Sequence, residues 1–243
     1  MKRSRRDFLE TLGAAAVAAA FGASLTSAQA ATAGAGKLKI GVVGSGRVGG
    51  TLGGVWVKAG HRVMFSSRHI ENDRKLAADL GPNAFAGTPR EAAAFGDVLM
   101  ISVPYGALPD VGRTLGKLLD GKIVIDTCNP FVSRDGEIAK RALEQGVGLV
   151  SAELLPGARI VRAFNAIGYT RMGQAHEHPG RVGMPIAGDD PEAIELASRL
   201  IRDIGYEPVL VGGLAKAKYL MPGTPLAGEH TPEEVHRIAA TLE

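Results

Sequence analysis

The sequence predicts an α/β protein: a single domain built around a doubly wound, mainly parallel sheet. Apolar runs of strand length alternate with segments of helical spacing along most of the 243 residues. The apolar fraction of 45% supplies one large core, and the chain length does not comfortably allow a second. A content of 33 glycines predicts many tight turns between these elements.

The first strand, turn and helix are the most informative segment of the chain. Residues 37–43 are predicted as a strand, residues 51–59 carry apolar side chains at helical spacing, and residues 61–65 form a second strand. Gly-Ser-Gly-Arg-Val-Gly occupies positions 44–49 between the first strand and the helix. This is the Gly-x-Gly-x-x-Gly motif in the strand–turn–helix setting of a Rossmann dinucleotide-binding unit. The alternative is a glycine-rich turn without a ligand.

Each glycine of the motif has a separate expected role. Gly44 permits the tight turn, Gly46 lets the backbone approach a pyrophosphate, and Gly49 lets the helix pack closely on the strand. The helix that follows presents N–H groups and a positive dipole end to the phosphates.

The end of the second strand indicates which dinucleotide binds. NAD-binding proteins usually carry Asp or Glu there, whereas this chain has Ser66, Ser67, Arg68 and His69, with no carboxylate before Glu71. Two hydroxyls and a guanidinium can bind a 2′-phosphate through charge-assisted hydrogen bonds. We therefore expect NADP rather than NAD. The alternative for Arg68 is a solvated loop arginine.

The remaining elements continue the alternation of strands and helices. We expect helices at 70–80, 191–204 and 231–242, with a short one after the cap Thr88-Pro89, and strands at 84–86, 97–103, 121–126, 159–164, 181–187 and 207–211. The predicted domain organisation is a signal peptide at 1–30, a flexible leader at 31–36, an NADP-binding domain at 37–212 and a C-terminal extension at 213–243.

Ligands of doubly wound sheets bind beyond the carboxyl ends of the strands. Ser102, Val103 and Pro104 follow one such strand and are expected to border the bridge between adenosine and nicotinamide. Asn129 and Asn165 follow two others and could hydrogen-bond the nicotinamide ribose or carboxamide. The alternative for each asparagine is a turn residue that bonds its own backbone.

The N-terminus predicts export. Residues 4–9 match the twin-arginine pattern, residues 12–25 are mildly apolar and rich in alanine, and residues 28–30 give an Ala-x-Ala cleavage signature. We expect the twin-arginine translocase as a partner and a periplasmic or secreted mature protein without a stable membrane anchor, because the apolar stretch is too short for a transmembrane helix. The alternative is an amphipathic helix with two chance arginines.

Charge and cysteine content exclude several classes of site. Four of the 28 basic and two of the 25 acidic residues lie in the first thirty positions, so the remainder is nearly neutral and no nucleic-acid partner is expected. The single cysteine, Cys128, excludes an internal disulfide. His176 and His178 could hold a metal, but a solvated loop is the favoured interpretation, so we expect no metal site. No catalytic residue is assigned.

Six segments together resemble the coenzyme F420-dependent NADP oxidoreductase family: IGVVGSGRVGG, SSR, ISVPYGAL, IDTCNP, VRAFNAIG and GGLAKAKYL. Related NADP domains occur in pyrroline-carboxylate reductases and membrane ferric reductases. The resemblance covers residues 37–220. It implies NADP bound in the crevice and hydride exchange with a deazaflavin. By position, the pyrophosphate would bind Ser45, Gly46, Arg47 and Val48, the 2′-phosphate Ser67 and Arg68, and the nicotinamide would lie near Val103 and Ala163.

The C-terminal part departs from the family pattern. Family members continue as an apolar helix that helps to close the site and dimerise, whereas Tyr-Leu-Met-Pro-Gly-Thr-Pro at 219–225 interrupts it here. A homodimer and the identity of the acceptor therefore stay open, with a flavin or ferric iron as substitutes for coenzyme F420. Two further functions remain: a reductase of a small imine or carbonyl compound, and a non-catalytic NADP-binding protein.

Overall fold

The computed structural model describes residues 36–242. The predicted signal peptide (1–30) and nearly all of the predicted leader (31–36) lie outside the described residues. The domain that begins at Leu38 is described below by itself.

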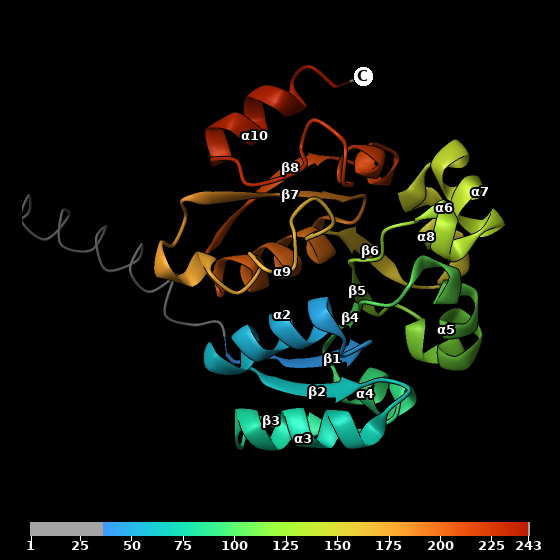
Figure 1. Cartoon of the computed structure of the whole chain (residues 1–243), viewed down its shortest axis with the longest axis vertical. Helices are drawn as coiled ribbons and strands as arrows, with labels where there is room; N and C mark the ends of the chain where they lie inside the picture. Colours follow the sequence, from blue (N-terminus) through green and yellow to red (C-terminus); the bar gives the residue numbers. More distant parts are fainter. Residues whose placement is uncertain (1–35, 243) are drawn as a thin grey trace, which may run out of the picture. The chain divides into compact units, whose positions relative to one another are not determined.

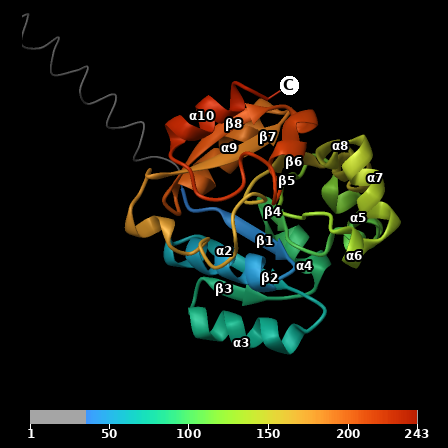
Figure 2. The same cartoon turned by 45° about the horizontal axis from the view of Figure 1, so that its top comes forward.

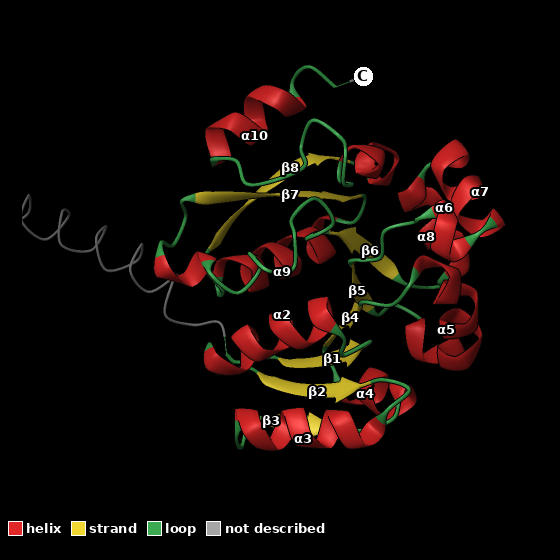
Figure 3. Ribbon diagram, viewed as in Figure 1, coloured by secondary structure: helices red, strands yellow, loops and turns green. Residues whose placement is uncertain are grey.

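One sheet of eight strands organises this domain, in the order β3-β2-β1-β4-β5-β6-β7-β8. All neighbouring pairs are parallel except β6 and β7, which pair antiparallel through Val161–Gly188 and Arg162–Ala187. The fold class expected from the sequence is therefore confirmed, and the order reverses between β1 and β4 (Figures 1 and 3). The strands are β1 Lys39–Val43, β2 Arg62–Ser66, β3 Ala84–Ala86, β4 Val98–Ile101, β5 Ile123–Asp126, β6 Arg159–Arg162, β7 Val182–Gly188 and β8 Tyr206–Gly212.

Helices cover both faces of the sheet (Figures 1 and 2). One face carries α2 Arg47–Lys58, α3 Ile70–Leu80 and α9 Pro191–Arg202. The other carries α4 Pro89–Phe95, α5 Leu108–Leu115, α7 Glu137–Gln145, α8 Val147–Leu154, the 3₁₀ helix η4 Leu214–Tyr219 and α10 Pro232–Ala239. Shorter helical turns lie at η1 Tyr105–Ala107, η2 Gly116–Leu119, α6 Val132–Asp135 and η3 Ala175–Glu177.

The central strands are buried on both faces, as parallel strands between helical layers must be. In β1, Ile40 and Val42 pack into the core beneath α2, whereas Val43 packs into the core on the opposite face of the sheet. Leu99 of β4 also packs on that opposite face. This alternation explains why the strands appear in the sequence as continuous apolar runs.

The predicted helix starts at α4 and α9 are confirmed by their caps. The Thr88 hydroxyl accepts a hydrogen bond from the Glu91 backbone N–H, and the Glu91 carboxylate accepts one from Thr88 N–H, which is a complete capping box. Asp190 caps α9 by accepting from the N–H groups of Glu192 and Ala193.

Residues 132–154 contain three short helices, α6, α7 and α8, that the sequence pattern does not predict. Gly136 and Gly146 separate them with φ values of +62° and +100°, a conformation that favours glycine. Each helix is too short to display a long periodic stripe, and α8 is apolar on nearly every side. Among residues 36–242, no helix combines the length and the apolar character that crossing a membrane requires.

Candidate cofactor-binding site

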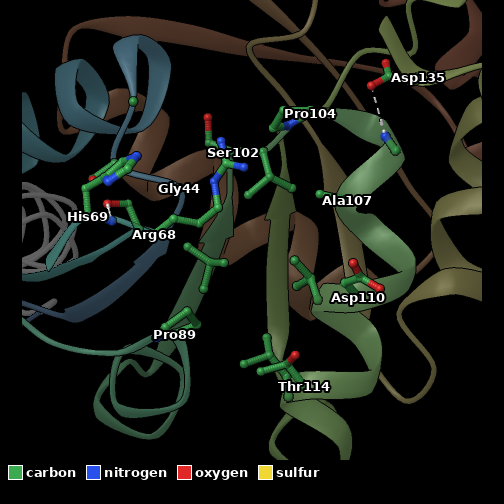
Figure 4. Close-up of a pocket in the computed structure, with 18 of the residues that line it drawn as sticks. Gly44, Arg68, His69, Pro89, Ser102, Pro104, Ala107, Asp110, Thr114 and Asp135 are labelled. Carbon is green, nitrogen blue, oxygen red and sulfur yellow. Dashed lines mark hydrogen bonds between the residues drawn. The ribbon is translucent and has the colours of Figure 1, made fainter.

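A cavity of about 800 Å³ lies where β1, β2 and β4 end, beside α5 (Figure 4). Eight residues expected from the sequence line it: Gly44, Ser45, Gly46, Ser67, Arg68, Ser102, Val103 and Pro104. The volume is in the range of small-molecule and cofactor pockets. The structure thus brings the glycine turn, the end of the second strand and the end of β4 into one crevice.

The three glycines of the turn differ in what surrounds them. A Cβ added to Gly44, where φ is +98°, would meet the Ser102 carbonyl oxygen at 2.2 Å, and one added to Gly49 would meet the Gly44 carbonyl oxygen at 2.0 Å. A Cβ on Gly46 would meet nothing within 4 Å. Packing of the protein itself therefore demands glycine at positions 44 and 49. At position 46 the open space is on the side from which a pyrophosphate would approach.

Arg47, Val48 and Gly49 form the first turn of α2 rather than the cavity wall. The first N–H groups of a helix have no partner within the helix and can bind an anion. The exposed Arg47 side chain lies over the Tyr169 ring, 5.1 Å from its centroid, and donates a hydrogen bond of 3.2 Å to the Tyr169 hydroxyl.

The two serines at the end of β2, Ser66 within the strand and Ser67 directly after it, are both engaged within the protein. Ser66 is fully buried and its hydroxyl donates to the Val42 carbonyl at 2.7 Å, so its side chain does not reach the cavity. Its own carbonyl accepts from the N–H groups of Gly44 and Ser45, at 2.8 and 3.1 Å. Ser67 does line the cavity, but its hydroxyl donates to Asp73 at 2.9 Å.

Arg68 is the cation at this end of the cavity. Its side chain is exposed, and in the part of the chain that the structure describes no hydrogen bond or ion pair engages its guanidinium. His69 and Asn72 line the cavity beside it (Figure 4 labels Arg68 and His69). A guanidinium has five N–H donors, and it can bind a phosphate through two parallel hydrogen bonds.

At the far end of the same sheet edge, the expected asparagines are enclosed. Asn129 donates from Nδ2 to the Asn165 carbonyl at 2.7 Å. Asn165 is 2% exposed, and within residues 36–242 neither atom of its amide has a hydrogen-bond partner. Ala163 is fully buried. None of these three residues lines the cavity.

A buried ion pair organises this enclosed region. Arg162 and Asp126, neighbours at the ends of β6 and β5, are both fully buried and lie 2.6 Å apart from Nη1 to Oδ2. Arg162 also donates to the Cys128 carbonyl at 2.8 Å, and the Cys128 N–H donates to Asp126 at 2.8 Å. We call residues 126–129 and 162–165 the sealed end. Burial, followed by the nearby Asp126 carboxylate, raises the pKa of the Cys128 thiol, so this cysteine is a buried structural thiol.

Arg134 and Asp135 of α6 form the rim of the cavity next to Pro104. Burial alone would raise the pKa of Asp135, but hydrogen bonds from Arg134 and from the N–H groups of Phe131 and Gly106 together lower it below the usual range. Asp135 is therefore ionised at neutral pH and accepts hydrogen bonds.

Sequence reasoning missed the wall that α5 provides. Asp110 and Thr114 of α5, with Ala107 directly before the helix, line the cavity opposite Arg68 (Figure 4). Val111 of α5 also lines the cavity. The helical spacing of Leu108, Val111 and Leu115 is the signal that could have identified α5. Within residues 36–242, no group of three or more His, Cys, Asp or Glu side chains could hold a metal ion.

Comparison with known proteins extends this description. Residues 39–130 match the family described as NADP oxidoreductase, coenzyme F420-dependent. The chain is 29% identical to the F420-dependent NADP reductase of Methanothermobacter thermautotrophicus over 203 residues, which cover 78% of this chain and 87% of that protein. It is 30% identical to metalloreductase STEAP3 of Rattus norvegicus over 183 residues, which cover 74% of this chain and 35% of that protein. The chain therefore spans about a third of the metalloreductase.

Two solved structures share the fold. A hypothetical protein of Sinorhizobium meliloti superposes with a TM-score of 0.65 at 21% identity, over 79% of this chain and 93% of that one. An imine reductase of Myxococcus stipitatus in complex with NAD⁺ superposes with a TM-score of 0.56 at 21% identity, over 75% of this chain and 58% of that one.

Proposed function

Since residues 39–130 match the model of the F420-dependent NADP oxidoreductase family, we propose that this chain is an NADP(H)-dependent oxidoreductase. Its acceptor is coenzyme F420 or a flavin, which take a hydride, or ferric iron, of which two ions take the two electrons of one NADPH while a proton is released. The observation that carries the proposal is the open cavity between Gly46 and Arg68, at the end of a strand–turn–helix unit.

The residues present fit NADP at three points. The open space over Gly46 and the first turn of α2 would hold the pyrophosphate, and the Arg68 guanidinium would hold the 2′-phosphate. Val103 and Pro104 would separate the adenosine side from the nicotinamide side. When bound, NADPH supplies the hydride, and the protein contributes position and orientation.

The Asn165 amide is complementary in its chemistry to the nicotinamide carboxamide, but it is enclosed at the sealed end. Among the described residues neither amide atom of Asn165 has a hydrogen-bond partner, whereas Asn129 donates to the Asn165 carbonyl. The Asn165 amide is buried, and neither asparagine lines the cavity. We therefore propose no direct carboxamide contact for Asn129 or Asn165.

Calorimetry with NADPH and NADH tests the cofactor. We expect NADPH to bind more tightly, and Arg68→Ala to weaken NADPH binding by at least tenfold while leaving NADH binding nearly unchanged. Arg74→Ala is the matched control, because Arg74 is an exposed arginine on α3 that pairs with Glu71 and lies outside the cavity lining. Equal affinities for the two dinucleotides in the wild type would remove the 2′-phosphate assignment.

A panel of acceptors tests the reaction. NADPH oxidation is expected with coenzyme F420, a flavin or ferric iron. Turnover only with a small imine or carbonyl compound would support the second candidate, whose fold is shared with an imine reductase. That chemistry needs a proton donor in the crevice, and Asp135, with its lowered pKa, is ionised and cannot donate. Binding without turnover of any acceptor would support the non-catalytic alternative.

We further propose that the twin-arginine signal at residues 1–30 directs export by the twin-arginine translocase to the periplasm or beyond. The pattern at residues 4–9 supports this. Changing Arg5 and Arg6 together to Lys should abolish accumulation outside the cytoplasm, measured by fractionation. Unchanged accumulation would contradict the proposal.

A further inference from the structure

Asp73 occupies a position of α3 where an apolar side chain is expected. The inward face of this helix is formed by Asp73, Leu76, Ala77 and Leu80, at the spacing of one helical stripe. Leu76 and Leu80 pack against the core, and Asp73 is fully buried, while the residues on either side of it are exposed. Buried carboxylates are rare unless they have partners.

The partners of Asp73 are the hydroxyls of two loops that the cofactor must touch. Ser45 of the glycine turn donates to Oδ1, and Ser67 after β2 donates to Oδ2 at 2.9 Å. Among the described residues, no Lys, Arg or His forms a salt bridge with Asp73. One carboxylate therefore holds two loops that are 22 positions apart in the sequence, with hydroxyl donors and no salt-bridge cation.

This arrangement decides what each serine can offer a phosphate. A hydroxyl has one hydrogen, and both hydrogens point to Asp73. The Ser67 oxygen also accepts the His69 N–H at 3.0 Å. Neither serine hydroxyl can then donate to an anion without breaking its bond to Asp73.

We propose that Asp73 is the positioning residue of the cofactor site. It fixes the glycine turn against the 2′-phosphate loop, and by engaging both hydroxyl hydrogens it leaves recognition of the 2′-phosphate to Arg68. This inference rests on the proposed function, because it assumes that the cavity binds a dinucleotide. The inference assigns the preference for NADPH over NADH to Arg68 and not to Ser67. From the sequence, both residues are expected to bind the 2′-phosphate.

The first experiment compares Ser67→Ala with Arg68→Ala, by calorimetry with NADPH and with NADH. Ser67→Ala should change the ratio of the two affinities by less than about twofold, because no hydroxyl contact to the phosphate is lost. Arg68→Ala should reduce that ratio by about tenfold or more. A fall in the ratio for Ser67→Ala as large as that for Arg68→Ala would overturn the proposal.

The second experiment replaces the carboxylate while keeping its shape. In Asp73→Asn an amide N–H can donate to one serine, which releases that hydroxyl hydrogen toward the cofactor, and a negative charge behind the phosphates disappears. NADPH should bind roughly three- to tenfold more tightly to this variant. A residue with only a structural role would not tighten binding when changed. Asp73→Ala, which removes the link between the loops, should weaken both dinucleotides by about tenfold.

Controls separate this inference from the cofactor assignment. Asp79→Asn removes a carboxylate from the exposed side of the same helix, where Asp79 pairs with Lys75, and should leave both affinities unchanged. Thermal unfolding of each variant identifies losses of fold. Unchanged or weaker NADPH binding by a folded Asp73→Asn variant overturns the role of Asp73 alone. Failure of the wild type to bind either dinucleotide overturns both that role and the proposed function.

Discussion

The two ends of the sheet edge are built from the same kinds of residue and behave in opposite ways. At the open end, formed by residues 44–46 and 67–72, Arg68 is exposed to a cavity of about 800 Å³ and has no ion-pair partner among the residues that the structure describes. At the sealed end Arg162 is fully buried against Asp126. A guanidinium that faces a cavity can bind an incoming anion, whereas one paired in the interior supports the fold. Whether an arginine binds a ligand or stabilises the fold is therefore decided by its burial and its partners, and not by its residue type.

The largest expected effect comes from breaking the ion pair of the sealed end. Arg162→Met leaves the Asp126 carboxylate buried without its cation, which should lower the free energy of unfolding by about 3–5 kcal/mol in denaturant titrations. The control is Arg159→Met on the same strand, because Arg159 is partly exposed and its loss should cost much less stability than the loss of Arg162. If both variants lose the same stability, the distinction between the two settings fails.

The glycine turn contains the same contrast between a role in stability and a role in binding, at Gly49 and Gly46. Gly49→Ala forces a Cβ against the Gly44 carbonyl and should lower stability by about 1–3 kcal/mol. Gly46→Ala meets nothing within 4 Å and should leave the unfolding free energy within about 0.5 kcal/mol, while NADPH binding falls by about tenfold or more. A Gly46→Ala variant that binds normally would contradict the placement of the pyrophosphate.

The smallest expected effect appears in alkaline solution. Burial raises the pKa of Tyr105 to about 12, and its hydroxyl donates to the Val147 carbonyl within the core beside the sealed end. The folded state therefore holds this proton more tightly than the unfolded state. Its contribution to stability is complete below the ordinary pKa of about 10 and is lost as the pH rises through about 12.

Tyr105→Phe should flatten the decline of the unfolding free energy between pH 10 and pH 12. Tyr169→Phe, at an exposed position on the loop after β6, is the matched control and should leave the slope as it is in the wild type. Burial also raises the pKa of Tyr206, so Tyr105→Phe removes only part of the decline. An identical slope in Tyr105→Phe and wild type would contradict a contribution of Tyr105 to it.

The sequence allowed prediction of the strands because their signal is local. The run Ile-Val-Ile at 123–125 is apolar and β-branched and lies between Gly121 and Pro130, and its identity as a strand depends on no distant residue. The glycine turn was predictable for the same reason. The antiparallel pairing of β6 and β7 was not, because it depends on the path of residues 163–181 over α2.

Site residues were harder to predict because their availability depends on distant partners. Ser66 and Ser67 are adjacent and chemically identical, yet one bonds the Val42 carbonyl and the other Asp73. Asn129 and Asn165 follow similar strand ends, yet in the described part of the chain the Asn129 amide donates a hydrogen bond whereas the Asn165 amide has no partner. A pattern of residue types cannot tell which hydroxyl or amide has already been used, since hydrogen bonds form across sequence separations that the pattern does not encode.

The ring of Phe164 has a consequence for how these variants can be observed. It stands edge-on between Trp56 of α2 and Tyr206 of β8, with ring centroids 6.2 and 5.8 Å apart. Trp56 is the only tryptophan of the chain, is fully buried, and donates to the Leu200 carbonyl of α9. Its fluorescence therefore comes from one position, where α2, the sealed end and the edge strand β8 meet. One intrinsic fluorophore can thus report the unfolding of all three regions without any label.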